Sequence, residues 1–193
     1  VEIEYAKYGI TTAENADGTL TVTGFDKDSA QRLNGNEELY VVNIPAELNG
    51  KKITAIKAGA FEGNEYIAEV YIANSVKVIG ERAFKDTTNL RRVAVTKGGL
   101  EEIGSYAFGN AGSYYDAVKN TYVASGELEM EIPLANLKTL APYAFKTKAI
   151  RVFTPVKGEE KRYLLSYPWS NPFVYPDANV GDFFFVCGGS GDN

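Results

Sequence analysis

The stretch Val76–Val95 reads VKVIGERAFKDTTNLRRVAV, and its apolar pattern returns along the chain at nearly constant spacing. Each copy has an apolar residue three positions before a second one, and an Ala-Phe pair four and five positions after it. The four copies are Ile53, Ile56, Ala60 and Phe61; Val76, Ile79, Ala83 and Phe84; Leu100, Ile103, Ala107 and Phe108; and Leu137, Leu140, Ala144 and Phe145. The first three phenylalanines are separated by 23 and 24 residues, and the fourth follows after 37. The chain therefore contains a repeat with one insertion.

A period of about 20 to 29 residues is typical of a leucine-rich solenoid. The second half of the quoted repeat, Leu90-x-x-Val93-x-Val95, predicts a strand whose apolar side chains face inward. The segments 67–72 and 39–44 have the same pattern, and Leu39 begins the latter. We therefore predict an α/β fold, a right-handed leucine-rich repeat solenoid in which short parallel strands stack from coil to coil.

The segments KAGAF, GERAF, GSYAF and APYAF connect the strands and predict one or two helical turns each, with Pro142 in the first turn of the last segment. Alanine before each phenylalanine leaves room for neighbouring rings to stack. We therefore expect the four phenylalanine rings to form a buried ladder, each contributing about 1.5 to 3 kcal/mol through burial.

The chain is predicted to be a single leucine-rich repeat domain, 1–193, because its length is that of about one domain. Residues 1–38 form an amino-terminal cap built on a β-hairpin around Asp17-Gly18, because a solenoid needs an atypical end unit over its first coil. Residues 39–153 hold the repeats with an insertion at about 110–127, and residues 154–193 form an irregular carboxy-terminal cap and tail. We expect Trp169 to cover the last coil and Cys187 to be a buried apolar residue.

Composition excludes several classes of function. The net charge of −5 and the pI of about 5.0 disfavour nucleic acid and anionic membranes as partners, and no apolar run is long enough to insert into a membrane. The absence of histidine excludes Ser-His and Cys-His triads and histidine metal sites. We predict no enzyme activity, no cofactor and no metal site. Glu129 and Glu131 share one face of a strand, and a solvated role is favoured over a catalytic one for them.

Outward side chains of the predicted strands form a second group of candidates, because parallel strands align them in columns. We predict a binding face on the strands at Asn43, Glu69, Tyr71, Arg92, Glu129, Glu131 and Arg151. Such a mixed surface suits a polypeptide or a glycan, although each residue alone is equally compatible with a solvated surface. Tyr114, Tyr115 and Tyr122 of the insertion are further binding candidates, and the alternative is that they cover the insertion's own core.

The segment Ser75–Phe84, SVKVIGERAF, closely resembles the repeat of the BspA-like leucine-rich repeat family, S-V-x-x-I-G-x-x-A-F. Residues 42–56 are similar to the usual entry of that family, and residues 152–169 are similar to its usual exit. Lys57 and Ala141 stand where glycine is usual, and the insertion is a further departure. The resemblance implies a secreted or surface-anchored bacterial protein involved in adhesion and in host or glycan interaction. It implies no catalytic residues.

Together these observations predict a non-catalytic binding module of the cell surface or extracellular space, whose signal segment has been removed and whose ligand is a host or matrix protein or a glycan. A structural spacer that positions other modules is the alternative. A glycan hydrolase based on carboxylates is a remote third possibility.

Overall fold

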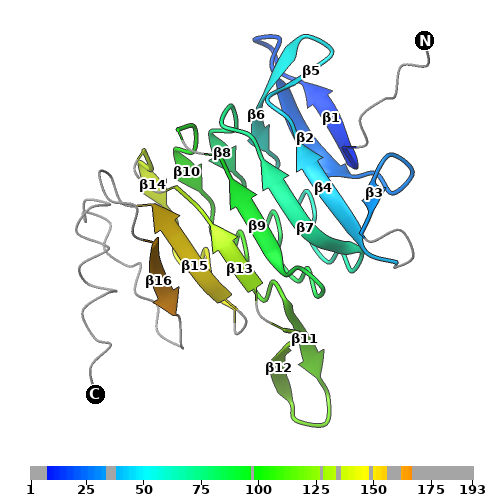
Figure 1. Ribbon diagram of the computed structural model, residues 1–193, viewed down its shortest axis with the longest axis vertical. Helices are drawn as coiled ribbons and strands as arrows, with labels where there is room; N and C mark the ends of the chain where they lie inside the picture. The colour runs from blue at the N-terminus through cyan, green and yellow to red at the C-terminus, as the bar shows by residue number, and fades with distance from the viewer. Residues whose placement is uncertain are drawn as a thin grey trace.

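The computed structural model describes residues 8–33, 38–96, 98–126, 128–133, 136–147, 150–155 and 162–166 (Figure 1). These residues form two seven-stranded sheets and one two-stranded hairpin. No helix occurs in the described ranges, and so none that could cross a membrane. The predicted carboxy-terminal cap beyond residue 166, with Trp169 and Cys187, lies outside them, as do the first seven residues of the predicted amino-terminal cap.

The first sheet has the order β16-β15-β13-β9-β7-β4-β3. Its five central strands are parallel, as the repeat predicts: β4 (Tyr40–Ile44), β7 (Ile67–Ile72), β9 (Arg92–Val95), β13 (Leu128–Glu131) and β15 (Ile150–Pro155). Antiparallel strands lie at the two ends, β3 (Gln31–Arg32) beside β4 and β16 (Arg162–Ser166) beside β15.

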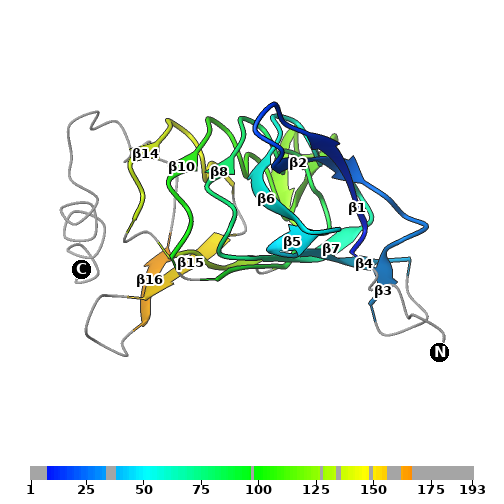
Figure 2. The ribbon, with the colours of Figure 1, turned by 90° about the horizontal axis from the view of Figure 1, so that it is seen from above.

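The second sheet lies on another side of the same coils and consists mostly of very short strands (Figure 2). Its members are β1 (Ile10–Glu14), β2 (Leu20–Phe25), β5 (Glu47–Leu48), β6 (Lys51–Ile56), β8 (Val78–Ile79), β10 (Glu102–Ile103) and β14 (Thr139–Leu140). Strands β1 and β2 form the antiparallel hairpin predicted around Asp17-Gly18, and β2 pairs in parallel with β6. Ile10, Leu20 and Val22 of this hairpin are buried in the common core.

The four phenylalanines form the predicted buried ladder between the sheets. Their ring centroids are 5.0 Å apart for Phe61 and Phe84, 5.2 Å for Phe84 and Phe108, and 5.6 Å for Phe108 and Phe145. All three pairs are stacked, with interplanar angles of 14°, 1° and 6°. The rings thus continue through the four successive coils from Phe61 to Phe145, and Ala83, Ala107 and Ala144 beside them are fully buried.

One inward residue of the first strand was predicted wrongly. Tyr40, which is 3% exposed, occupies the position predicted for Leu39 and lies in register with Ile67. The register of β4 against β7 shifts between Tyr40 and Val41, so the spacing of this strand differs from that of its neighbours. Leu39 instead packs on the outer face of the sheet in a small apolar cluster with Leu33 and Val41.

The predicted helical turns are wrong, because the segments between β6 and β7 and between β8 and β9 are runs of tight turns. Alternate backbone N–H groups donate to backbone carbonyls of the next coil. The N–H of Gly59 donates to Glu81 at 2.9 Å, that of Phe61 to Ala83 at 2.7 Å, and that of Gly63 to Lys85 at 2.8 Å. In an α-helix each N–H after the first four bonds to the carbonyl four residues earlier in the same segment. Here the coils share their hydrogen bonds, and a third side of the solenoid results.

Each of the first three runs of turns has two residues in the left-handed region: Gly59 and Gly63, Arg82 and Asp86, and Tyr106 and Asn110. Gly59, Arg82, Tyr106 and Tyr143 occupy the same place in successive coils, with φ of 68°, 54°, 53° and 61°. Glycine adopts this conformation without strain, whereas the three larger residues do not. The rings of Tyr106 and Tyr143 stack at 5.2 Å, and the Lys146 ammonium lies 5.1 Å from the Tyr143 ring centroid. These contacts offset part of the backbone strain.

Gly80 explains why the repeat has glycine after its second apolar residue. A Cβ at Gly80 would lie 2.4 Å from the backbone nitrogen of Ala58 in the preceding coil, closer than any side-chain atom can approach. Lys57 occupies the equivalent place in the first coil, where its N–H bonds to Val22 of β2 at 2.9 Å. No repeat coil precedes Lys57, so the exposed lysine side chain is tolerated there.

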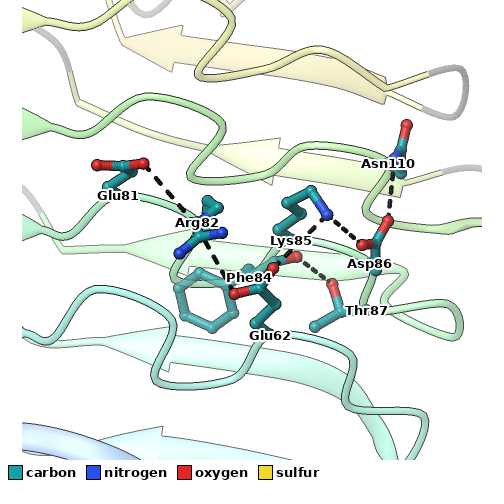
Figure 3. Close-up of polar contacts among 8 residues, drawn as sticks. All are labelled: Glu62, Glu81, Arg82, Phe84, Lys85, Asp86, Thr87 and Asn110. Carbon is teal, nitrogen blue, oxygen red and sulfur yellow. Dashed lines mark hydrogen bonds and ion pairs between the residues drawn. The ribbon is translucent and has the colours of Figure 1, made fainter.

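Polar side chains cover the third side of the solenoid, next to the buried Phe84 ring (Figure 3). The Lys85 ammonium lies between the carboxylates of Glu62 and Asp86, and its hydrogen bond to Asp86 raises the pKa of Lys85 above its ordinary value. The Thr87 hydroxyl donates to the Phe84 carbonyl at 2.7 Å inside the protein. Exposed ion pairs of this kind contribute about 0 to 1 kcal/mol each, so burial of the rings dominates the stability of this side.

Candidate functional site

Alternation along the strands turns one set of side chains inward and a second set outward. Val42, Val70, Val93 and Met130 are buried in the core. Their neighbours form two outward columns across the strands, because the strands are aligned residue by residue. The first column is Asn43, Tyr71, Ala94 and Glu131, and the second is Val41, Glu69, Arg92 and Glu129. Arg151 is paired in register with Glu129. The sheet thus places the predicted strand-face residues in two adjacent rows.

At the centre of this face, three of the predicted residues contact one another: Tyr71, Glu69 and Arg92. The Tyr71 hydroxyl donates a hydrogen bond to a Glu69 carboxylate oxygen at 2.8 Å. The Arg92 guanidinium carbon lies 5.9 Å from the centroid of the Tyr71 ring. Partial burial, followed by the hydrogen bond to Glu69, raises the pKa of the Tyr71 hydroxyl above its ordinary value. These contacts hold Tyr71 in one position across the strands.

A shallow groove of about 420 Å³ follows the first column at the carboxyl ends of the strands. Ala94 is small and lies in register between Tyr71 and Glu131, so it leaves a gap between the two larger side chains. The groove is lined by Asn43, Ile44, Pro45, Tyr71, Ile72, Ala73, Ala94, Val95, Thr96 and Glu131. Sequence reasoning identified only Asn43, Tyr71 and Glu131 as site residues. The short side chain at Ala94, between larger outward neighbours, is the signal it missed.

The other predicted strand-face residues lie beside the groove. Glu69, Arg92 and Glu129 belong to the second column, and Arg151 lies in register with Glu129 on β15. Val41, on β4 at one end of this column, is only 9% exposed because it packs in a cluster with Leu33.

Within the predicted insertion, β11 (Ser113–Asp116) and β12 (Thr121–Ala124) form an antiparallel hairpin that projects from the solenoid (Figure 1). Tyr114 and Tyr115 are 43% and 53% exposed. Tyr115 contacts Tyr122 edge to face at 5.4 Å, and its hydroxyl donates to the Asn120 side chain. Much of the Tyr114 and Tyr115 surface therefore stays open to solvent instead of covering a core of the insertion.

The tip of the hairpin is closed by Asp116. One carboxylate oxygen accepts hydrogen bonds from the backbone N–H groups of Val118 and Lys119, at 2.9 and 3.0 Å. The other lies 3.4 Å from the Lys119 ammonium. The hydrogen bond from the Lys119 backbone is the largest cause that lowers the pKa of Asp116 below its ordinary value. The loop is thus fixed by its own polar groups, while Val118 is 96% exposed.

The structure does not bring the hairpin tyrosines and the groove together. The hairpin is joined to the amino-terminal end of β13, whereas the groove lies at the carboxyl ends of the same parallel strands. The two surfaces therefore occupy opposite edges of the strand face (Figure 1). One small ligand could not contact both.

The carboxylates of the strand face differ in their surroundings. Glu131 lines the groove, and Glu129 is exposed outside it, although the two point from the same face of β13 as predicted. In the part of the chain that the structure describes, no three acidic or cysteine side chains gather into a group that could hold a metal ion.

Comparisons with known proteins agree with this architecture. Residues 54–156 match the family model described as "BspA type Leucine rich repeat region (6 copies)". Among solved structures, the chain is similar to a leucine-rich repeat protein from Bacteroides capillosus, with 25% identity and a TM-score of 0.52, over 75% of this chain and 94% of that one. It is also similar to a leucine rich cell surface protein from Faecalibacterium prausnitzii, with 21% identity and a TM-score of 0.47, over 78% of this chain and 42% of that one. No curated protein matches the chain.

Proposed function

This chain belongs to the BspA-type leucine-rich repeat family, and on that premise we propose that it is a non-catalytic binding module of a secreted or surface-exposed bacterial protein. The ligand we propose is an extended polypeptide segment that lies over the strand face. The observation that carries this proposal is the groove at Ala94, which crosses several strands and has an apolar floor.

The lining of the groove supports a polypeptide ligand. Tyr71 is held by Glu69 and offers an aromatic wall, and aromatic side chains are common anchors of protein interfaces. Pro45 and Ala73 contribute partly exposed apolar surface beside Ala94, whereas Ile72 and Val95 are buried in the core below it. Polar and charged groups at the rim, among them Asn43 and Glu131, give an extended chain hydrogen-bonding partners and fix its register.

The charged second column supports specificity more than affinity. Glu69, Arg92 and Glu129 alternate in sign across three neighbouring strands. Exposed charges of this kind steer a partner and disfavour wrong registers, with little net gain in affinity. In this proposal Arg151 continues the alternation, and the hairpin tyrosines form a separate contact surface at the other edge.

A hydrolytic role is not proposed for the carboxylates. A glycosidase places its two carboxyl groups on opposite sides of the bond that is cleaved. Glu131 lines the groove whereas Glu129 lies outside it, so the pair does not flank one bound sugar.

The test is to fill the groove without disturbing the core. Ala94 points outward, so Ala94→Trp should block the groove and leave the thermal unfolding midpoint unchanged. A displayed library of random linear peptides would be selected on the immobilised wild-type protein, and the affinities of enriched peptides would be compared for wild type and variant. We expect a loss of at least about tenfold, or 1.4 kcal/mol, in Ala94→Trp.

Lys52→Trp is the matched control, because Lys52 is exposed on β6, which belongs to the other sheet. This variant should bind the enriched peptides as the wild type does. Enriched peptides that bind equally to Ala94→Trp would contradict the proposal. A glycan array, probed in parallel, tests the other ligand class, and binding to glycans alone would also overturn it.

A further inference from the structure

We propose that two copies of this chain associate through the hairpin of the insertion, by antiparallel pairing of β12 with β12 of the second copy. The pairing builds one sheet in the order β11-β12-β12-β11. This inference goes beyond the proposed function and does not depend on the groove, because it names the chain itself as the partner of the separate hairpin surface. It is carried by the direction of the backbone groups along β12 and by the side chains beside them.

The hairpin is a sheet of only two strands that projects from the solenoid (Figure 1). An isolated pair of strands is marginally stable in water, and stable sheets need roughly three or more strands or packing against another element. In the part of the chain that the structure describes, β12 pairs with no strand except β11. The outer edge of β12 is therefore available to a third strand.

The backbone bonds of the hairpin indicate which residues of β12 face outward. The Ser125 N–H donates to the Gly112 carbonyl at 2.7 Å, just before the register pair of Ser113 with Ala124. In an antiparallel ladder, bonded pairs alternate with pairs whose N–H and carbonyl groups point away from the neighbouring strand. The N–H and carbonyl groups of Tyr122 and Ala124 therefore lie on the outer edge. None of the described residues bonds to them.

The other edge of the hairpin is less open, because β11 is anchored to the solenoid where it begins. Ser113 is 2% exposed, and its N–H donates to the Asn110 carbonyl at 3.1 Å. Its hydroxyl lies 3.2 Å from the Thr147 hydroxyl. Ala124, at the end of β12, is exposed instead. A further strand is therefore expected on the β12 side.

The edge of β12 lacks the features that protect edge strands from pairing. Natural edges have charged side chains, prolines or bulges, or they are very short. The strand Thr121–Ala124 reads TYVA and contains no charged residue and no proline. By contrast, β1 shifts its register between Thr11 and Thr12, and β3 has two residues, one of them Arg32. Tyrosine, valine and threonine also favour extended backbone, so β12 is suited to pairing.

One register satisfies all of the outward groups at once. With a two-fold axis at Val123, Tyr122 pairs with Ala124 of the second copy, and Ala124 pairs with Tyr122 of that copy. Each pair exchanges N–H to carbonyl bonds in both directions, as bonded pairs of an antiparallel ladder do. Val123 lies opposite Val123 of the second copy in a non-bonded pair, in which the Cα atoms are about 4.5 Å apart. The strand is thus complementary to itself.

The side chains match in the same register. On one face Tyr122 lies opposite Ala124 of the second copy, whose small side chain leaves room for the ring. The Tyr122 ring already contacts Tyr115 edge to face at 5.4 Å on this face. On the other face Val123 lies opposite its own copy and beside Tyr114, which is 43% exposed and in register with Val123. The pairing therefore covers apolar surface on both faces of the hairpin.

The symmetry of the contact determines the kind of assembly. The same strand contributes from both copies, so the contact is isologous and closes at a dimer. One strand from each copy makes an interface below about 1,200 Å², which is typical of weak and transient association.

The first experiment measures self-association by sedimentation velocity of the wild-type chain between about 10 µM and 1 mM, the range of a weak interface. We expect the weight-average sedimentation coefficient to rise with concentration towards that of a dimer. Val123→Lys should abolish the rise, because like charges then lie opposite each other at the axis. Val78→Lys is the matched control, since Val78 is also a half-buried strand residue but belongs to the second sheet, and it should associate as the wild type does.

A second variant removes a backbone donor instead of adding a charge. Ala124→Pro lacks the outward N–H, whereas the bonds between β11 and β12 do not use that group. Association should be lost in this variant as well, with the thermal unfolding midpoint of the solenoid unchanged.

A mixing experiment tests the register. Val123→Lys and Val123→Glu should each remain monomeric alone, whereas an equimolar mixture should form a one-to-one dimer, because opposite charges then face each other at the axis. A contact elsewhere on the surface would not be restored by this mixture.

Each outcome has a defined meaning. A wild-type sedimentation coefficient that stays constant up to about 1 mM overturns the inference, as do a Val123→Lys variant that associates like the wild type and a mixture that remains monomeric. Ala94→Trp should dimerise normally, because the groove takes no part in the contact. If library peptides lose affinity for Ala94→Trp but the wild type does not dimerise, the proposed function stands without the inference. If the chain dimerises through β12 but the peptides bind Ala94→Trp unchanged, the inference stands alone.

Discussion

The rings of Phe84 and Phe108 lie face to face in consecutive coils, with centroids 5.2 Å apart and planes inclined by 1°. They are the middle pair of a ladder that reaches from Phe61 to Phe145. Because both rings are fully buried, each one contributes to packing with two neighbouring coils. The stability of the strand face, and of the groove on it, therefore depends on residues that no ligand can touch.

Truncation of Phe84 should remove the centre of this ladder. Phe84→Ala leaves a cavity between Phe61 and Phe108 that the rigid coils cannot close, and we expect a loss of about 3 to 5 kcal/mol in the free energy of unfolding. Urea unfolding followed by circular dichroism measures it. Tyr66→Ala, at an exposed aromatic residue, should change the value by less than about 0.5 kcal/mol. A loss below about 1 kcal/mol for Phe84→Ala would show that the ladder is not essential.

Gly80→Ala should force two coils apart. The new Cβ would meet the backbone nitrogen of Ala58 at 2.4 Å, and overpacking against backbone costs about 1 to 3 kcal/mol. Gly126→Ala is the matched control, because a Cβ there meets no atom within 4 Å. Thermal unfolding of both variants measures the difference. Equal midpoints would mean that the coils can separate without cost.

Glu101 should make stability depend on pH. It accepts hydrogen bonds from Lys138 at 2.6 Å and Lys77 at 3.0 Å, and both bonds, the one from Lys138 first, hold the pKa of Glu101 below its ordinary value. A carboxyl whose pKa is lowered by folding stabilises the protein above its unfolded pKa, and this contribution is lost as the pH falls through the folded pKa.

The corresponding measurement compares Glu101→Gln with the wild type in thermal melts from pH 7 to pH 3. The variant should melt lower at pH 7, and the difference should shrink towards zero as the wild-type carboxylate becomes protonated. High salt should also reduce the difference, because these side chains are partly exposed. A difference that is constant over the whole pH range would assign the effect to packing.

Several features of the fold could be predicted because they repeat. Val93 and Val95 are buried as their spacing indicates, and the alanine and phenylalanine of each repeat predict the ladder. A buried face imposes the same requirement in every coil, so the same residue types recur at one period. Leu39 is the exception, because β4, the first of the parallel strands, has a register shift that its apolar pattern does not reveal.

The turns could not be told from helices in the same way. Ala83 and Phe84 lie four and five positions after Ile79, a spacing that also suits one side of a helix. These turns differ from a helix in the carbonyl groups that accept hydrogen bonds from alternate N–H groups. The N–H of Phe84, for example, donates to the carbonyl of Ala107 in the next coil at 2.7 Å. Such a partner is 23 residues away along the chain, and no local pattern identifies it.

The sequence by itself determined the period, the inward residues and the columns in which Tyr71, Arg92 and Glu129 lie, because alternation and burial act on each repeat separately. Only the tertiary structure decided that Ala94 opens a groove between Tyr71 and Glu131, and that the tip with Val118 lies at the opposite edge. Both depend on how neighbouring coils are aligned and on the direction in which a hairpin leaves the solenoid. These relationships arise between segments distant in sequence, through backbone hydrogen bonds that any residue type except proline can donate.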